Sequence, residues 1–283
     1  MKTKKYINNF DPKTKLFHYT EYTDEHYLKI KKNNGLVFDE NYPYFDNSKS
    51  FLFKQKLIRI LLILIVFPIT RIRLGLRIKG RKNIKNNKEL FKKGVITISN
   101  NVHLWDYICI NRALMPHKMH TIVWPYNVRS ENSFLVRMVG GVPIPDNNIN
   151  GSIKFNNEVN KYLQNGGLLH IYPEGSMWEY YKPIRPFKRG VAHYAINNNV
   201  PIIPLAFSYR KPGFIRRKIF HQIALFTLNI GDAIIPDYQE LNKDNEIDLI
   251  NKCHKEVCIL SGVDPIDNIY EANYNKTKRI DYY

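Results

Sequence analysis

Short apolar runs alternate with helical patterns through the middle of the chain, and this alternation restricts the fold more than any other feature. The strand-like runs are rich in β-branched residues and span residues 95–98, 120–124, 168–172, 202–207 and 226–230. Apolar side chains at helical spacing occupy residues 104–114, 132–139, 153–163, 190–197 and 245–260. Such alternation predicts an α/β fold with a mainly parallel sheet covered by helices on both faces.

The chain around this alternation divides into four predicted parts. Residues 1–50 have no clear period and form an irregular N-terminal extension, and residues 51–70 form an apolar helix. Residues 71–262 form the α/β domain and residues 263–283 a C-terminal tail. Within the domain, period-two alternation over 71–79 predicts a half-buried strand, followed by a Lys- and Asn-rich loop.

The apolar helix is too short to cross a membrane by itself. Residues 57–69 are almost wholly apolar, interrupted by Arg59 and closed by Pro68, whereas spanning takes about 20 apolar residues. It is either a buried core helix or a helix lying in the membrane interface. We favour the interface because cations bracket it, namely Lys54, Lys56, Arg59, Arg71 and Arg73. A span lengthened by neighbouring residues remains an alternative.

The charge of the chain calls for an anionic partner. Lys and Arg number 43 against 25 acidic residues, a formal net charge of +18, which suits nucleic acid or an acidic membrane surface. Nucleic acid is disfavoured because cations flank the apolar helix and no nucleic-acid-binding module is present. Cys109, Cys253 and Cys258 form no CxxC pair and no secretory signal is visible. We therefore expect a peripheral or monotopic protein on the cytoplasmic face of a membrane.

One junction between strand and helix carries candidate catalytic residues. The run at 95–98 ends in Ser99, Asn100 and Asn101, residue types that suit a turn and a helix N-cap. His103 and Asp106 follow, at the carboxyl end of a strand, where open α/β sheets bind ligands. Because the two residues are spaced i, i+3, we expect the Asp106 carboxylate to orient the His103 imidazole as a general base.

Three more motifs follow at intervals along the chain. Gly140-Gly141-Val142-Pro143 is a glycine turn into a short strand and would permit close approach of a ligand. Residues 172–176 (Tyr-Pro-Glu-Gly-Ser) follow a buried strand, so Glu174 is expected at the same edge of the sheet as His103. Residues 200–204 (Val-Pro-Ile-Ile-Pro) begin the next strand.

These four blocks, in this order, resemble the glycerolipid acyltransferase family typified by lysophosphatidic acid acyltransferases. The resemblance covers about residues 71–236 and extends to Phe187-Lys188-Arg189-Gly190. It implies transfer of a fatty acyl group from acyl-CoA or acyl-carrier protein to a hydroxyl or amine of a lipid-like acceptor. It implies no cofactor beyond this co-substrate and no metal. The apolar helix before the domain corresponds to the segment that seats the family on the membrane.

The sequence departs from the family pattern at the residues that do chemistry. Asn101 occupies the position of the family's catalytic His, and an amide cannot take a proton from a hydroxyl. His103 is therefore the candidate base. The acceptor site implied by the resemblance comprises Asn101, Gly140, Gly141, Pro143, Glu174, Gly175, Ser176, Arg185 and Lys188.

The family's phosphate-binding arginines are also replaced, because their positions fall near Asp146 and on Met177. We therefore expect an acceptor other than a simple glycerol phosphate, with Arg185 and Lys188 as substitute cations. Two functions remain open: an acyltransferase with weak activity that depends on His103 and rises with Asn101→His, or a catalytically degenerate, membrane-bound lipid-binding relative.

Overall fold

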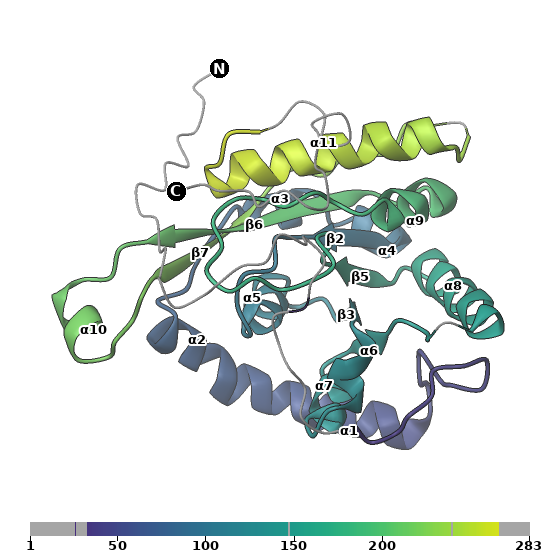
Figure 1. Cartoon of the computed structure of the whole chain (residues 1–283), viewed down its shortest axis with the longest axis horizontal. Helices are drawn as coiled ribbons and strands as arrows, with labels where there is room; N and C mark the ends of the chain where they lie inside the picture. The colour runs from purple at the N-terminus through teal and green to yellow at the C-terminus, as the bar shows by residue number, and fades with distance from the viewer. Residues whose placement is uncertain (1–25, 27–32, 147, 239, 266–283) are drawn as a thin grey trace.

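The computed structural model describes residues 26, 33–146, 148–238 and 240–265, which contain a seven-stranded sheet (Figure 1). Its strand order is β1-β7-β6-β2-β5-β3-β4. Neighbouring strands are parallel except for the antiparallel pair β6–β7. The predicted mainly parallel α/β sheet is thus confirmed.

Each strand-like run of the sequence forms a strand, with ends shifted by a few residues at most. The strands are β1 (Arg77–Lys79), β2 (Val95–Ile98), β3 (Met119–Val123), β4 (Gly141–Pro143), β5 (Leu168–Ile171), β6 (Ile202–Arg210) and β7 (Leu225–Ile230). Because β2 and β5 lie in the middle of the sheet, the chain segments that follow them are placed side by side.

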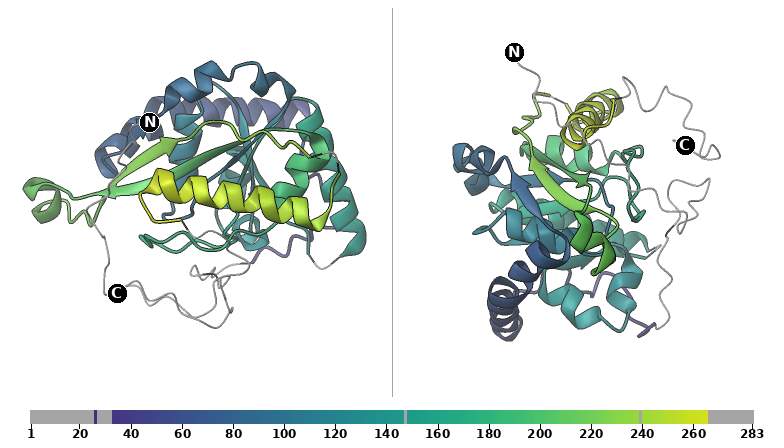
Figure 2. Two further views of the ribbon diagram at one scale, coloured as in Figure 1. Left: turned by 90° about the horizontal axis from the view of Figure 1, so that it is seen from above. Right: turned by 90° about the vertical axis from the view of Figure 1, so that its left-hand side faces the viewer.

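Helices cover both faces of the sheet (Figures 1 and 2). One buried cluster joins the sheet to α8 (Ile149–Gln164), α9 (Gly190–Asn198) and α11 (Lys243–Ser261). The opposite cluster contains α3 (Arg81–Asn86), α4 (Leu90–Lys93) and α5 (Asp106–Ala113). The remaining helices are α1 (Lys49–Leu61), α2 (Phe67–Arg73), α6 (Pro125–Arg129), α7 (Ser133–Met138) and α10 (Phe214–Lys218).

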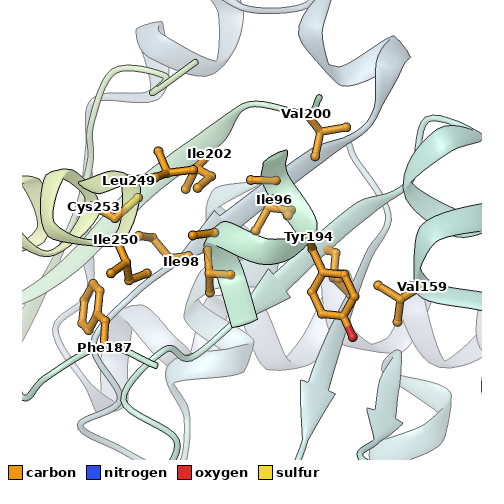
Figure 3. Close-up of a cluster of buried hydrophobic side chains, with 14 of the residues drawn as sticks. Ile96, Ile98, Val159, Phe187, Tyr194, Val200, Ile202, Leu249, Ile250 and Cys253 are labelled. Carbon is orange, nitrogen blue, oxygen red and sulfur yellow. The ribbon is translucent and has the colours of Figure 1, made fainter. Parts of the chain in front are cut away.

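The core follows from the period-two pattern of the strands. In β2, Ile96 and Ile98 join the cluster under α8, α9 and α11, whereas Val95 joins the cluster on the opposite face. Figure 3 shows Ile96 and Ile98 among side chains from these helices, including Val159 and Leu249. The sheet is therefore apolar on both sides, as a buried parallel sheet requires.

A long helical segment, Lys49–Arg73, runs past the sheet and turns its apolar side outward. It consists of α1, a π-helical turn η1 (Leu62–Val66) and α2. Its exposed side chains include Phe53, Leu57, Ile60, Leu61, Leu64, Ile65, Ile69 and Ile72, whereas Gln55, Leu62, Phe67 and Thr70 are buried. The alternative of a buried core helix is therefore wrong. Among the described helices, none combines the length and apolar character that crossing a membrane requires.

Three local expectations are corrected. The strand expected over 71–79 begins only at Arg77, because α2 continues to Arg73. Pro68, expected to close the apolar helix, is the second residue of α2 and directly follows the π-helical turn and Phe67. The expected Lys- and Asn-rich loop contains α3 and α4. Helix α5 begins at Asp106 with Trp105 at the N-cap, not near Ser99 to Asn101.

Part of the predicted N-terminal extension packs on the domain. Residues 33–48 are irregular, and Phe38 and Tyr44 are buried in the core, where the Tyr44 hydroxyl donates to the Phe38 carbonyl over 2.9 Å. Most of the extension before residue 33, and the predicted tail from residue 266 onward, lie outside the described residues.

Candidate active site

The register between β2 and β5 brings two of the sequence motifs together. Ile98 pairs with Ile171, so the segments that follow both strands leave the same edge of the sheet. There the backbone N–H of Asn101 donates to Glu174 Oε2 over 3.0 Å. The Asn101–Asp106 block and the Pro-Glu-Gly block therefore form one site.

Below this edge, Glu174 and Arg185 form a buried ion pair. Arg185 Nη2 lies 2.9 Å from Glu174 Oε2, and the Arg185 backbone N–H donates to Oε1 over 2.9 Å. Arg185 Nη1 also donates to Ser176 Oγ over 2.6 Å, and the guanidinium lies 4.6 Å from the ring centroid of Trp178. The Arg185 and Glu174 side chains are only 1% and 2% exposed. Both residues, expected to contact the acceptor, instead form the scaffold under the site.

Asp106 supports the backbone, not the imidazole. Its Oδ2 atom accepts the backbone N–H groups of Val102 and His103, over 2.6 and 2.8 Å. Burial raises the pKa of the Asp106 carboxyl well above its ordinary value, while the two amide donors act in the opposite direction. Asp106 thus closes the turn that enters α5, and the expected contact between Asp106 and the His103 ring is absent.

His103 has a partner at each ring nitrogen. The backbone N–H of Trp105 donates to Nδ1 over 3.1 Å, which places the proton of the neutral ring on Nε2, 3.5 Å from Glu179 Oε1. Burial, with a smaller contribution from Arg73, lowers the pKa of His103 to about 4. The imidazole is therefore neutral and weakly basic at pH 7, and each of its nitrogens already faces a protein group.

A cavity of about 1300 Å³ opens beside these residues. Its polar lining includes Asn101, His103, Ser176 and Lys188. Apolar and aromatic side chains line much of the remainder, among them Ile108, Val136, Val139, Ile144, Phe155, Met177, Val191 and Tyr194. This volume exceeds the roughly 300–1,000 Å³ of most small-molecule sites and provides room for an extended apolar group.

The two parts of Asn101 have different surroundings. Its backbone N–H is bound by Glu174, and its carbonyl accepts the Trp178 backbone N–H over 3.1 Å. Its side chain lines the cavity and has no hydrogen-bond partner within the described part of the protein. Position 101 is thus fixed in space while its side chain faces the cavity.

The Gly-rich block packs against protein backbone. A Cβ atom on Gly140, whose φ is +101°, would lie 2.6 Å from the Met119 carbonyl oxygen, and one on Gly141 would lie 2.7 Å from that of Val136. Gly141 lines the cavity, whereas Gly140 and Pro143 do not. These glycines permit close packing of α7, β3 and β4, and not the close ligand approach that we expected.

Asp146 and Met177, which replace the family's phosphate-binding arginines, both have structural surroundings unsuited to binding phosphate. Asp146 accepts from the Arg129 side chain and the Phe38 backbone N–H, so it ties the N-terminal segment to the domain. Met177 presents an apolar side chain to the cavity. Lys188 lies beside Gly175, where a Cβ atom would stand 2.8 Å from Lys188 Cε.

Sequence reasoning missed Glu179 and the apolar cavity wall. Glu179 lies in an irregular segment without a motif, and cavity-lining residues such as Phe155 and Val191 have the helical spacing of ordinary core residues. Within the described ranges, no group of His, Cys, Asp or Glu residues is arranged to hold a metal ion.

Comparison with known proteins identifies the domain. Residues 75–208 match the protein-family model described as Acyltransferase. These residues are an acyltransferase domain. The matched part contains β1 to β5, most of β6 and the strand ends around Asn101 and Glu174. The family inferred from the four sequence blocks is thereby confirmed.

Matches to other proteins are distant. A comparison with curated protein sequences finds no match. Solved structures similar to this chain include the 1-acyl-sn-glycerophosphate (LPA) acyltransferase PlsC from Thermotoga maritima. It is 15% identical, with a TM-score of 0.46, and the match covers 76% of this chain and 81% of that one. The substrate of PlsC is not carried over on so distant a likeness.

Proposed function

We propose that this acyltransferase moves a fatty acyl group from the thioester of acyl-CoA or acyl-carrier protein to a hydroxyl or amine of a lipid-like acceptor. The observation that carries the proposal is the cavity of about 1300 Å³, which joins a polar lining at Asn101, Ser176 and Lys188 to a largely apolar interior. An apolar interior of this volume suits a fatty acyl chain.

The reaction needs positioning and proton removal, and this site provides mainly the first. The acceptor oxygen or nitrogen attacks the thioester carbonyl, the bond from carbon to sulfur breaks, and the thiolate leaves with the acyl group on the acceptor. The acceptor's proton would pass to a base, which at position 101 is missing. Since general-base catalysis contributes about 10²- to 10⁴-fold, we expect slow turnover.

A simple glycerol phosphate is not the acceptor that this cavity favours. Lys188 is the only Lys or Arg that lines the cavity among the described residues, and Met177 is apolar. Arginine binds phosphate oxygens in a planar, bidentate manner and is over-represented at such sites, whereas lysine contributes a single point charge. Soluble glycerol phosphate should therefore be neither acylated nor able to protect the site.

We further propose that the protein acts on the cytoplasmic face of an anionic membrane, which it reaches through the segment Lys49–Arg73. The exposed apolar side chains of this segment lie among cations such as Lys54, Lys56 and Arg71. Replacing Phe53, Leu64 and Ile65 by Ser should release the folded full-length protein from acidic vesicles. Unchanged binding of this variant would contradict attachment through this segment.

The test of activity is acceptor-dependent cleavage of acyl thioesters by the purified protein in detergent. Ser152→Trp, which fills part of the cavity from α8, should reduce transfer of long acyl groups more than transfer of short ones. Ile153→Trp is the matched control, because Ile153 is exposed and does not line this cavity. Equal effects of both variants would contradict binding of the acyl chain in the cavity.

The alternative is lipid binding without turnover, and the surroundings of His103 favour it. Because Nδ1 accepts from the Trp105 backbone N–H and Nε2 faces Glu179, neither ring nitrogen of His103 is free to take the acceptor's proton. If neither the natural protein nor Asn101→His cleaves any acyl thioester while fatty acyl ligands still bind, the enzyme proposal fails and lipid binding stands.

A further inference from the structure

A hairpin arm formed by β6 and β7 carries a short helix at its tip. These strands are the antiparallel pair of the sheet, and α10 lies between them in sequence and projects at one end of the molecule (Figures 1 and 2). Four large apolar side chains in and after α10 are exposed: Phe214 (69%), Ile215 (61%), Ile219 (65%) and Phe220 (62%). No chemical role at the cavity accounts for them.

Cations accompany these apolar side chains. Lys211, Arg217 and Lys218 are exposed, and Arg216 is half-buried. No acidic residue occurs from residue 210 to residue 231. The tip is therefore both apolar and positively charged, a combination that complements an anionic lipid surface.

The tip is held against the end of the Lys49–Arg73 segment. Arg216 Nη1 donates to the Ile72 carbonyl over 2.9 Å, and Gln222 Nε2 donates to the Arg73 carbonyl over 2.5 Å. At the base of the arm, an Arg210 guanidinium nitrogen donates to the Gly75 carbonyl. Ile72, whose side chain is exposed, is thus bound through its carbonyl to α10. The exposed apolar side chains of the Lys49–Arg73 segment and those of α10 therefore meet at Ile72.

We propose that α10 is a second membrane-docking element, which enters the same anionic lipid surface as the Lys49–Arg73 segment. A single interfacial helix leaves the domain able to rotate about the helix axis. A second contact at the end of the arm removes this freedom, so the cavity is held at one orientation to the lipid. The inference shares with the proposed function only the anionic membrane, and α10 is tested by its own variants.

Charge and exposure favour a membrane over other partners. An exposed apolar patch marks a protein or membrane contact. A nucleic acid would use the cations but would leave Phe214, Ile215, Ile219 and Phe220 in water. An anionic lipid surface satisfies the charged and the apolar side chains together.

Insertion of the tip is measured with a fluorophore. The three natural cysteines are all buried, so a single exposed Cys can be labelled selectively in the folded full-length protein. Ile215→Cys carries an environment-sensitive fluorophore. Ile149→Cys is the control, because Ile149 is exposed and belongs to α8, which lies on the other side of the molecule from α10 (Figure 1). Phosphatidylcholine vesicles containing phosphatidylglycerol should shift the emission of the label at 215 to the blue and leave the label at 149 unchanged.

Binding is measured by vesicle flotation with three double variants. Arg217→Gln with Lys218→Gln should weaken binding about 30-fold, the effect of two cations near an anionic surface. Phe214→Ser with Phe220→Ser should weaken it at least as much. Ile149→Ser with Ile153→Ser on α8, which removes two exposed apolar side chains elsewhere, should leave it unchanged. Circular dichroism and any thioester cleavage in detergent should be unaffected in all three.

The outcomes separate this inference from the proposed function. If the label at 215 stays in water on bound protein, or if both α10 variants bind vesicles like the natural chain, the inference is overturned while attachment through Lys49–Arg73 stands. If the variants lose binding to heparin or DNA but keep binding to vesicles, the tip binds nucleic acid and the inference is likewise overturned. Loss of vesicle binding in the α10 variants with an unchanged fold supports it, whether or not thioester cleavage is found.

Discussion

The polar residues at the strand ends fall into two groups, which differ in what surrounds them. Glu174, Arg185 and Asp106 are buried, and each has several hydrogen-bond or ionic partners on the protein. Asn101 and Lys188, in contrast, direct their side chains to the cavity or its edge. The first group, which we call the scaffold group, fixes backbone positions, and the second, the cavity group, presents chemistry to a ligand.

This difference shows that the architecture of the site and its chemistry are separable. The scaffold group includes Asp106 and Glu174, which belong to the sequence blocks that resemble the acyltransferase family, whereas the cavity group departs from that family at Asn101. Changes to the scaffold group should therefore affect stability, and changes to the cavity group should affect rate. The four predictions below test this division, from the largest expected effect to the smallest.

Asn101→His should increase the rate of thioester cleavage about 10²- to 10⁴-fold, the usual contribution of a general base. The backbone at 101 is already held by Glu174 and Trp178, so the new imidazole would project into the cavity. Single-turnover cleavage of an acyl thioester measures the effect. Asn101→Gln, which keeps the amide, is the control and should give no increase; an equal increase in both variants would contradict the role of a base.

Arg185→Met should lower the free energy of unfolding by about 3–5 kcal/mol, because it leaves the buried Glu174 carboxylate without its counter-charge. Urea unfolding measures the change. Lys252→Met is the control: it removes an exposed ion pair with Asp248 and should cost at most about 1 kcal/mol. If Arg185→Met keeps its stability but loses ligand binding, Arg185 belongs to the cavity group.

Acidification from neutral pH to about pH 4.5 should lower the free energy of unfolding of the natural protein by about 2 kcal/mol more than that of the variant His103→Gln. The pKa of His103 is lowered to about 4 in the folded protein, against about 6.5 in an unfolded chain. As the pH falls from about 6.5 towards 4, the unfolded state binds a proton that the folded state does not, so stability is lost.

Urea unfolding at neutral pH and at about pH 4.5 measures this loss in the natural protein and the variant. The exposed His221 provides the control variant, His221→Gln. A loss of equal size with and without His103 would contradict the lowered pKa.

His103→Gln should have the smallest effect on rate, less than about threefold, because the imidazole is engaged by Trp105 and faces Glu179. The measurement is the same thioester cleavage assay at neutral pH. A fall of about 100-fold or more would show that His103 is the base, and would add it to the cavity group.

The sequence predicted much of the fold because its signals are local and periodic. Apolar spacing and flanking glycines predicted the strands from β2 to β7. The same signals predicted the helices α5, α7, α8, α9 and α11. The path from residue 71 to residue 94 was not predictable in the same way. The alternation of apolar and basic residues over 71–79 predicted a strand, but its first residues form the end of helix α2. Helices α3 and α4 contain mainly polar residues, so no apolar spacing indicated them.

Motif order placed the site, but side-chain roles depended on tertiary contacts. Spacing i, i+3 indicated that Asp106 could reach His103, but not that it would bind the backbone N–H. Arg185 was expected to be a cation of the acceptor site, whereas its ion pair with Glu174 is buried under the site. The depth of the cavity depends on α7, α8 and α9 together, and no single stretch of sequence contains that information.

At Asn101 the protein binds the backbone and leaves the side chain facing the cavity, and this arrangement has a genetic consequence. Codons for Asn and His differ by one base, so a point mutation connects this sequence to one with an imidazole at the same place. No compensating substitution is required, because the partners of position 101 recognise its amide and carbonyl. Selection could thus silence or restore proton transfer in a lineage while leaving the folded domain intact.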